Sequence, residues 1–217
     1  VYTPFHGTGY RLVPEALRRL GVKELFPVPE QMVVNGDFTT VKSPNPEEEE
    51  SFALAVSLAE KVGAQLIIGT DPDADRVGVM VPDGNGGYSH ITGNQMGVLL
   101  LDYILEARRR KGTLPSNAAA LKTIVTTELA RIVAETNGVA MEDTFTGFKF
   151  IAEKIAEYEK SRSREIIFAF EESYGYLIGD FVRDKDAVSA SVLIAEMAAW
   201  YHLHGKTLID AMLGIYE

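Results

Sequence analysis

The segment AQLIIGTDPDADRVGVMV at residues 64–81 contains two apolar runs separated by an acidic loop. Ala64–Gly69 and Val77–Val81 are short, apolar and rich in β-branched residues, so we predict that both are strands. A strand that ends directly in a polar loop is typical of α/β proteins, where such loops face a ligand crevice. The segment therefore predicts both a sheet and a candidate site at the edge of that sheet.

The loop contains three aspartates at alternate positions, Asp71, Asp73 and Asp75. Pro72 disfavours a helix, and an extended backbone points alternate side chains in the same direction. Three carboxylates that converge repel one another unless a positive charge compensates them. Carboxylate oxygens are the ligands that Mg²⁺ prefers, so we expect a magnesium site.

Other interpretations of this loop fit less well. A calcium-binding EF-hand loop requires glycine at the sixth position and glutamate at the twelfth, where this chain has Arg76 and Pro82. A haloacid-dehalogenase-type phosphatase also has an Asp-x-Asp after a buried strand, but it usually continues with threonine or valine where this chain has Asp75. A turn with solvated carboxylates stays open as the simplest alternative.

Strands and helices alternate along the rest of the chain, which predicts an α/β fold. Further strands are expected at Tyr88–Ile91, Lys122–Thr126 and Glu165–Phe170. The glycine-rich turn at residues 83–87 and the fresh strand–helix series that follows place a domain boundary near Ile91. We therefore expect two consecutive α/β domains of similar topology, with mixed sheets flanked by helices, at residues 1–90 and 91–217.

Three helices have recognisable ends. Asn45-Pro46-Glu47-Glu48 predicts a helix start, with an N-cap, a proline at the first position and an acidic first turn. Thr92 with Gln95 predicts a capping box at the start of a second helix. A third is expected to begin near Asp186 and to bury an apolar stripe: Val188, Val192, Ala195, Ala199 and Trp200.

A second group of polar residues follows the predicted strand that ends at Phe170. Glu171 and Ser173 could bind neighbouring hydroxyls of a sugar, because a carboxylate accepts hydrogen bonds and serine donates or accepts them. Lys149 and Lys185 are cations that could bind phosphate, or equally solvent-exposed residues at helix starts.

The composition excludes several classes of protein. The chain has 217 residues, 46% hydrophobic and 24% charged, and a formal net charge of −10. Clustered cations are missing, and the basic run Arg108–Lys111 is interpreted as a helix end, so we expect no nucleic-acid partner. There is no cysteine and hence no thiolate chemistry. With no apolar run long enough to span a bilayer and no signal pattern, we expect no membrane partner and a cytoplasmic location.

Six motifs occur in the order seen in α-D-phosphohexomutases, and the chain most resembles the bacterial phosphoglucomutase/phosphomannomutase group. The motifs are TPFHGTG (3–9), NPE (45–47), DPDADR (71–76), TGNQ (92–95), TGFK (146–149) and FEESYGY (170–176). Such enzymes have four domains, and this chain resembles the second and third. Ala74 occupies a position of the aspartate loop that is often glycine in this family.

The resemblance implies roles for individual residues. Asp71, Asp73 and Asp75 would bind Mg²⁺, and Arg76 would lie near the transferring phosphoryl group. Glu171 and Ser173 match contacts to sugar hydroxyls. Lys185 matches a lysine near the substrate, and Lys149 is a weaker match.

The implied activity exchanges hexose 1-phosphate and hexose 6-phosphate, from glucose or mannose, through a phosphoserine and a bisphosphorylated sugar. The family's Ser-His-Asn-Pro and Arg-x-Ser-Gly-Thr segments, from the first and fourth domains, do not occur in this sequence. We therefore expect the chain alone to be inactive and to require those domains as partners. Three alternatives stay open: a metal-dependent phosphatase with Asp71 as nucleophile, a phosphopentomutase, and a non-enzymatic module that binds sugar phosphates.

Overall fold

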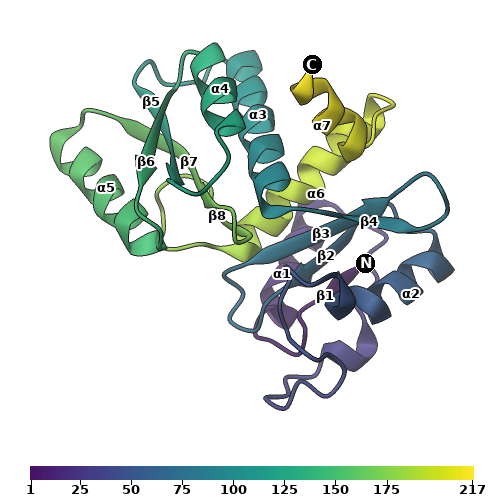
Figure 1. Ribbon diagram of the computed structural model, residues 1–217. Helices are drawn as coiled ribbons and strands as arrows, with labels where there is room; N and C mark the ends of the chain where they lie inside the picture. Colours follow the sequence, from purple (N-terminus) through teal and green to yellow (C-terminus); the bar gives the residue numbers. More distant parts are fainter.

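A computed structural model describes all 217 residues of the chain, which form two lobes, each built on a four-stranded sheet (Figure 1). In the first sheet β1 pairs parallel to β2, while β2, β3 and β4 pair antiparallel in that order. Its strands are β1 (Tyr2–Thr3), β2 (Ile67–Thr70), β3 (Val77–Pro82) and β4 (Tyr88–Ile91). The same lobe contains two α-helices and two 3₁₀ turns: α1 (Gly9–Leu20), α2 (Ala53–Val62), η1 (Pro29–Gln31) and η2 (Glu49–Phe52).

The second sheet has the order β6-β5-β7-β8. β5 pairs parallel with β6 and β7, and β8 pairs antiparallel with β7. Its strands are β5 (Ala118–Thr123), β6 (Ala140–Thr144), β7 (Glu165–Glu171) and β8 (Gly175–Leu177). Five helices belong to this part of the chain: α3 (Gly93–Lys111), α4 (Leu129–Thr136), α5 (Phe148–Ser161), α6 (Ala187–Leu203) and α7 (Leu208–Tyr216).

These two mixed sheets with their helices confirm the predicted fold class. Ile91 is the last residue of β4, and Thr92 alone separates it from α3. The domain boundary between residues 90 and 91 stays a prediction.

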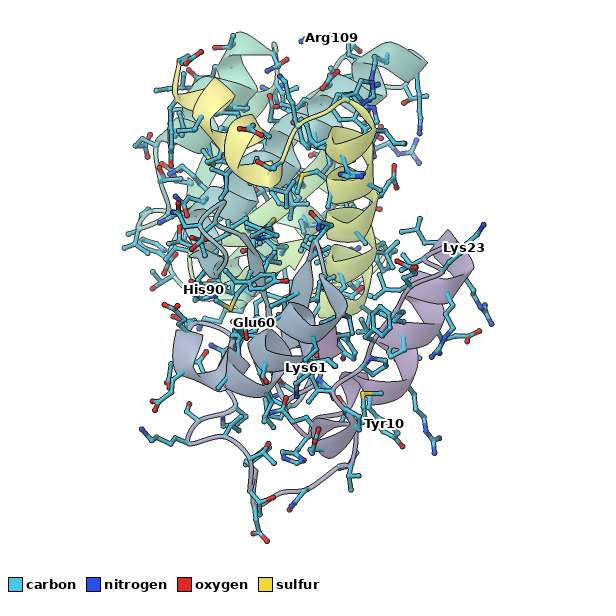
Figure 2. The ribbon with its side chains drawn as sticks, turned by 90° about the vertical axis from the view of Figure 1, so that its right-hand side faces the viewer. Tyr10, Lys23, Glu60, Lys61, His90 and Arg109 are labelled. Atoms are coloured by element: carbon cyan, nitrogen blue, oxygen red, sulfur yellow. The ribbon has the colours of Figure 1, made fainter.

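One hydrophobic core continues from the first lobe into the second. Val13 and Leu17 of α1 belong to the same buried cluster as Ile194 and Met197 of α6. Figure 2 shows α1, which lies between the labels Tyr10 and Lys23, alongside α6. The two lobes are therefore joined by a packed helix pair.

Most of the predicted helix ends are confirmed. The Thr92 hydroxyl accepts a hydrogen bond from the Gln95 N–H, and the Gln95 side chain returns to the Thr92 backbone, which completes the capping box of α3. The Asp186 carboxylate accepts from the N–H groups of Val188 and Ser189 at the start of α6. The basic run 108–111 forms the last turn of α3.

Two predictions of element position were wrong. The helix expected from Asn45 begins only at Ala53, after the 3₁₀ turn η2. Asn45 Oδ1 accepts a hydrogen bond from Glu47 N–H at 3.0 Å, as an N-cap would, but the residues that follow form a turn there. The strand expected at Lys122–Thr126 runs instead from Ala118 to Thr123. Its three consecutive alanines have a low strand propensity, yet they lie buried between helices in the middle of the sheet.

The buried face of α6 also differs from the predicted stripe. The residues it buries are Ala187, Ala190, Ser191, Ile194, Met197 and Tyr201, while Ala199 is exposed. The helix is apolar around most of its circumference, so its own sequence does not indicate which side meets the core. No helix combines the length and the apolar composition needed to cross a bilayer.

Candidate functional site

The aspartate loop lies between β2 and β3, and its three carboxylates converge. One oxygen from each of Asp71, Asp73 and Asp75 lies within 4.8 Å of the others. Asp71 is buried, Asp75 is half-buried and Asp73 is exposed. This arrangement of oxygen donors fits a hard divalent cation with coordination positions left for water or phosphate.

Asp71 forms the buried floor of the cluster. Its Oδ1 accepts hydrogen bonds from the backbone N–H groups of Asp75, at 3.1 Å, and Arg76, at 3.0 Å. Its Oδ2 accepts from Arg76 Nε at 2.8 Å. Burial raises the pKa of Asp71 to about 6, although the hydrogen bonds from Arg76 oppose the rise.

Neighbouring segments hold the backbone of the loop in place. Thr8 N–H donates to the Pro72 carbonyl at 2.7 Å, and Ala187 N–H, at the start of α6, donates to the Ala74 carbonyl at 3.1 Å. Gly7 permits the first contact, because a Cβ there would lie 2.3 Å from Pro72 Cα. The loop is thus fixed from both lobes of the molecule.

Arg76 extends the cluster towards a second segment of the first lobe. Its Nη1 donates to Glu47 Oε1 at 2.9 Å and, at 3.4 Å, to Asn45 Oδ1. Together with the Nε contact to Asp71, these bonds occupy two of the three guanidinium nitrogens. Nη2 makes no hydrogen bond within the chain, so it is the donor that an anionic ligand could use.

The second lobe meets the aspartate loop through backbone and side-chain contacts. Val77 N–H donates to the Tyr174 carbonyl at 3.0 Å, and Arg76 pairs with Gly175 in an antiparallel bridge. Lys185 Nζ lies 2.9 Å from Asp75 Oδ2. The Lys185 side chain crosses Gly175, where a Cβ would lie 2.1 Å from its Cδ.

These contacts bring Lys185 and the loop after β7 to the aspartates. Burial lowers the pKa of Lys185, but its ion pairs with Asp75 and Asp184 outweigh burial and raise that pKa overall. The amine therefore stays protonated. A cavity of about 530 Å³ opens here, lined in part by Asp73, Asp75 and Lys185, a size typical of small-molecule sites.

Glu171 is buried at the end of β7, where its Oε1 accepts a hydrogen bond from Gly147 N–H at 2.9 Å. Burial raises the pKa of this carboxyl group. Ser173 lies half-buried in the same loop. Lys149, near the start of α5, is exposed and lies 4.7 Å from the Phe150 ring. No hydrogen bond or ion pair joins the side chain of Lys149, Glu171 or Ser173 directly to the aspartate loop. The Glu171–Gly175 segment meets that loop through the backbone of Tyr174 and Gly175.

Sequence reasoning missed two carboxylates of the site. Glu47, which we had assigned to an acidic helix start, pairs with Arg76 instead. Glu172 Oε2 accepts hydrogen bonds from the hydroxyls of Thr123, at 3.0 Å, and Thr126, at 2.9 Å, and so anchors the loop that carries Glu171 and Ser173. The NPE motif at residues 45–47 was the one available signal for Glu47.

His6, in the glycine-rich turn after β1, holds two loops together. Its Nδ1 donates to the Val33 carbonyl at 2.8 Å, so in the neutral ring Nε2 accepts from the Thr40 hydroxyl, also at 2.8 Å. The ring is buried and both nitrogens have partners. This role is structural.

The fold and these contacts define a two-domain α/β protein with a candidate cation site at the junction of its domains. Residues 1–86 match the family model of phosphoglucomutase/phosphomannomutase alpha/beta/alpha domain II, and residues 92–216 match that of domain III. The chain belongs to the phosphoglucomutase/phosphomannomutase family.

Curated relatives agree along the whole chain. A phosphoglucomutase of Staphylococcus aureus is 42% identical over 217 residues, and one of Staphylococcus haemolyticus is 40% identical. Both matches cover 100% of this chain and 38% of the relative. The chain therefore spans well under half the length of these relatives.

Solved structures share the fold. A putative phosphomannomutase from Thermus thermophilus matches with a TM-score of 0.77 at 24% identity, covering 99% of this chain and 44% of that one. An Aspergillus fumigatus N-acetylphosphoglucosamine mutase in complex with GlcNAc-6P and magnesium matches with a TM-score of 0.51 at 11% identity, covering 95% and 49%. At these identities the likeness is one of fold alone.

Proposed function

We propose that this chain forms the metal-binding and sugar-recognition part of an enzyme that moves a phosphoryl group between positions 1 and 6 of glucose or mannose phosphate. The observation that carries the proposal is the junction itself. The three converging aspartates are joined to the Glu171–Gly175 loop by the bridge between Arg76 and Gly175 and by the ion pair between Lys185 and Asp75.

Asp71, Asp73 and Asp75 would hold Mg²⁺, for which their oxygen donors fit. When bound, this ion supplies positive charge against the negative charge that spreads over a transferring phosphoryl group. Arg76 donates from Nη2 to the same group. Lys185, kept protonated by its acidic neighbours, adds a second cation at the junction.

Glu171 and Ser173 would bind the sugar. The carboxylate accepts hydrogen bonds from hydroxyls, and the serine either donates or accepts them. Glu172 lies between these two residues, and its hydrogen bonds to Thr123 and Thr126 hold this part of the backbone in place. Lys149, exposed near the start of α5, would bind a phosphate group of the substrate.

The phosphoserine that donates and receives the phosphoryl group would come from a segment outside these 217 residues. Because the donor group is missing from the chain, we expect no mutase turnover by the chain alone. A chimaera tests this: the chain replaces the matching 38% of the Staphylococcus aureus phosphoglucomutase, and conversion of glucose 1-phosphate is measured with a bisphosphate activator. A folded but inactive chimaera, or turnover by the chain alone, would contradict the proposal.

Magnesium binding gives a test that does not depend on turnover. Titration calorimetry of the chain should show one Mg²⁺ site, and Asp73→Asn should weaken binding at least about tenfold, because an amide oxygen carries no charge. Asp37→Asn, in an exposed loop, removes the same charge and should leave the affinity unchanged. Equal effects of the two substitutions would refute the assigned site.

The phosphatase alternative also uses Asp71, here as the nucleophile. Both oxygens of Asp71 accept hydrogen bonds but keep lone pairs that could meet phosphorus or a cation, so these contacts do not separate the two proposals. Phosphate release from an aryl phosphate that Asp71→Asn abolishes would support the phosphatase alternative. No contact in the structure favours a pentose over a hexose.

A further inference from the structure

Arg76 is held by two acidic residues that bind different nitrogens of its guanidinium group. Asp71 accepts from Nε at 2.8 Å and Glu47 accepts from Nη1 at 2.9 Å. The remaining nitrogen, Nη2, makes no hydrogen bond within the chain. Because Nε and Nη1 are both held, the planar guanidinium group points Nη2 in a single direction.

The loop that carries Glu47 is itself fixed. Asn45 Oδ1 accepts from Glu47 N–H at 3.0 Å, and the Asn45 carbonyl accepts from Glu48 N–H at 3.1 Å. The Pro46 carbonyl lies directly on β3, since a Cβ on Gly78 would be 2.4 Å from it. Glu47 is therefore presented from a rigid turn that rests on the strand that follows Arg76.

The ion pair between Arg76 and Glu47 is expected to contribute little to the stability of the fold. The Arg76 side chain is 28% exposed and that of Glu47 39% exposed, and ion pairs at such positions contribute little to folding. An unrestrained arginine side chain, however, loses rotamer entropy when it is ordered. A partner that orders it before a ligand arrives removes that cost from binding.

We propose that Glu47 is a positioning residue: it holds Arg76 so that Nη2 is ready to donate to the phosphate of a sugar phosphate. The inference rests on the proposed function, because it names Arg76 as the group that meets the phosphate. It adds that the NPE loop, rather than the aspartate loop alone, sets the orientation of that group.

The first test observes Arg76 without any ligand. In ¹⁵N NMR of the 217-residue chain, the Arg76 Nε–H signal should exchange slowly with water. Glu47→Gln should speed this exchange at least about fivefold, which corresponds to roughly 1 kcal/mol of lost restraint. Glu48→Gln is the matched control: it is the next residue, exposed and without an ion pair, and it should leave the signal unchanged. An unchanged Arg76 signal in Glu47→Gln overturns the inference.

The second test measures binding of glucose 1-phosphate with saturating Mg²⁺. Glu47→Gln should weaken binding about fivefold, and Glu48→Gln less than about twofold. In an Arg76→Lys background, Glu47→Gln should have almost no further effect, because lysine lacks the planar group that Glu47 orients. A purely structural role for Glu47 would persist in that background and contradict the inference.

The two tests separate the two proposals. If the wild-type chain shows no binding of glucose 1-phosphate, the proposed function fails, while the NMR measurement still decides whether Glu47 positions Arg76. If the wild-type chain binds the ligand and Glu47→Gln binds it equally well, the inference fails and the proposed function stands.

Discussion

Ala74 adopts a left-handed backbone conformation in the middle of the aspartate loop, with φ of 61°. This conformation costs a residue with a Cβ about 1–2 kcal/mol. The loop keeps it because the Ala74 carbonyl accepts from Ala187 N–H and the Pro72 carbonyl accepts from Thr8 N–H.

Ala74→Gly should therefore stabilise the chain by up to about 1 kcal/mol, because relief of the strained φ exceeds the extra entropy of glycine in the unfolded state. Urea unfolding measures the change. Ala199→Gly is the control: it lies exposed inside α6 and should lose about 1 kcal/mol. A loss of similar size at Ala74 would contradict the φ argument.

His90 makes the junction sensitive to acid. Its ring lies 5.4 Å from the Tyr174 ring in a stacked arrangement and 5.5 Å from Phe52, and Figure 2 labels it where the lobes meet. Burial lowers the pKa of His90. Below its ordinary pKa of about 6.5 the unfolded chain binds the proton and the folded chain does not, so stability falls as pH falls through that value.

The predicted effect is a loss in the free energy of unfolding between about pH 7.5 and about pH 5.5 that depends on His90. His90→Phe should remove this part of the pH dependence. His204→Gln, at an exposed histidine, should keep it. Identical pH profiles for the wild type and His90→Phe would show that the ring does not couple protons to folding.

At the scale of elements, α3 and β7 approach closely because Gly97 of α3 has no side chain and lies against the Phe170 ring of β7. A Cβ at Gly97 would lie 2.1 Å from the Phe170 ring atoms. Phe170 directly precedes Glu171, so this close approach fixes the distance between α3 and the start of the Glu171–Gly175 loop. A glycine that helix propensity disfavours is kept here for packing.

Gly97→Ala should cost about 1–3 kcal/mol through overpacking, although alanine is the better helix former. Gly214→Ala in α7, where a Cβ meets nothing within 4 Å, should instead gain up to about 1 kcal/mol. Chemical unfolding of both variants measures the contrast. Stabilisation by both substitutions would mean that α3 moves away from Phe170 without cost.

Element prediction succeeded where the signal was local and failed where burial overrode it. The capping residues Thr92 and Asp186 placed the starts of α3 and α6 correctly, since a cap is made within one turn. The alanines of β5 lack any local strand signal. Asparagine is a favourable N-cap residue, but Asn45 lies in a loop in which Glu47 forms an ion pair with Arg76.

At the scale of the whole molecule, the lobes share a core in which α1 packs on α6. Trp200 on α6 is the single tryptophan, so its fluorescence reports unfolding of the second lobe. The shared core predicts that both lobes unfold in one transition, because neither can lose the helix pair without exposing apolar surface.

Leu17→Ala in α1 of the first lobe should therefore lower the stability that Trp200 fluorescence reports by about 2–5 kcal/mol, since Leu17 is buried in the shared core. Leu12→Ala, on the same helix but 63% exposed, should change it by less than about 0.5 kcal/mol. If Leu17→Ala leaves the stability reported by Trp200 fluorescence unchanged, the two lobes unfold independently.

The sequence by itself determined the α/β class, the aspartate loop after its strand, and the family, because each is written in consecutive residues: a strand pattern, a cap or a motif. The tertiary structure alone decided that Lys185 meets Asp75, that Glu47 holds Arg76, and which side of α6 is buried. These contacts join segments far apart in the chain, and their partners are chosen by packing between the lobes, which no local pattern encodes.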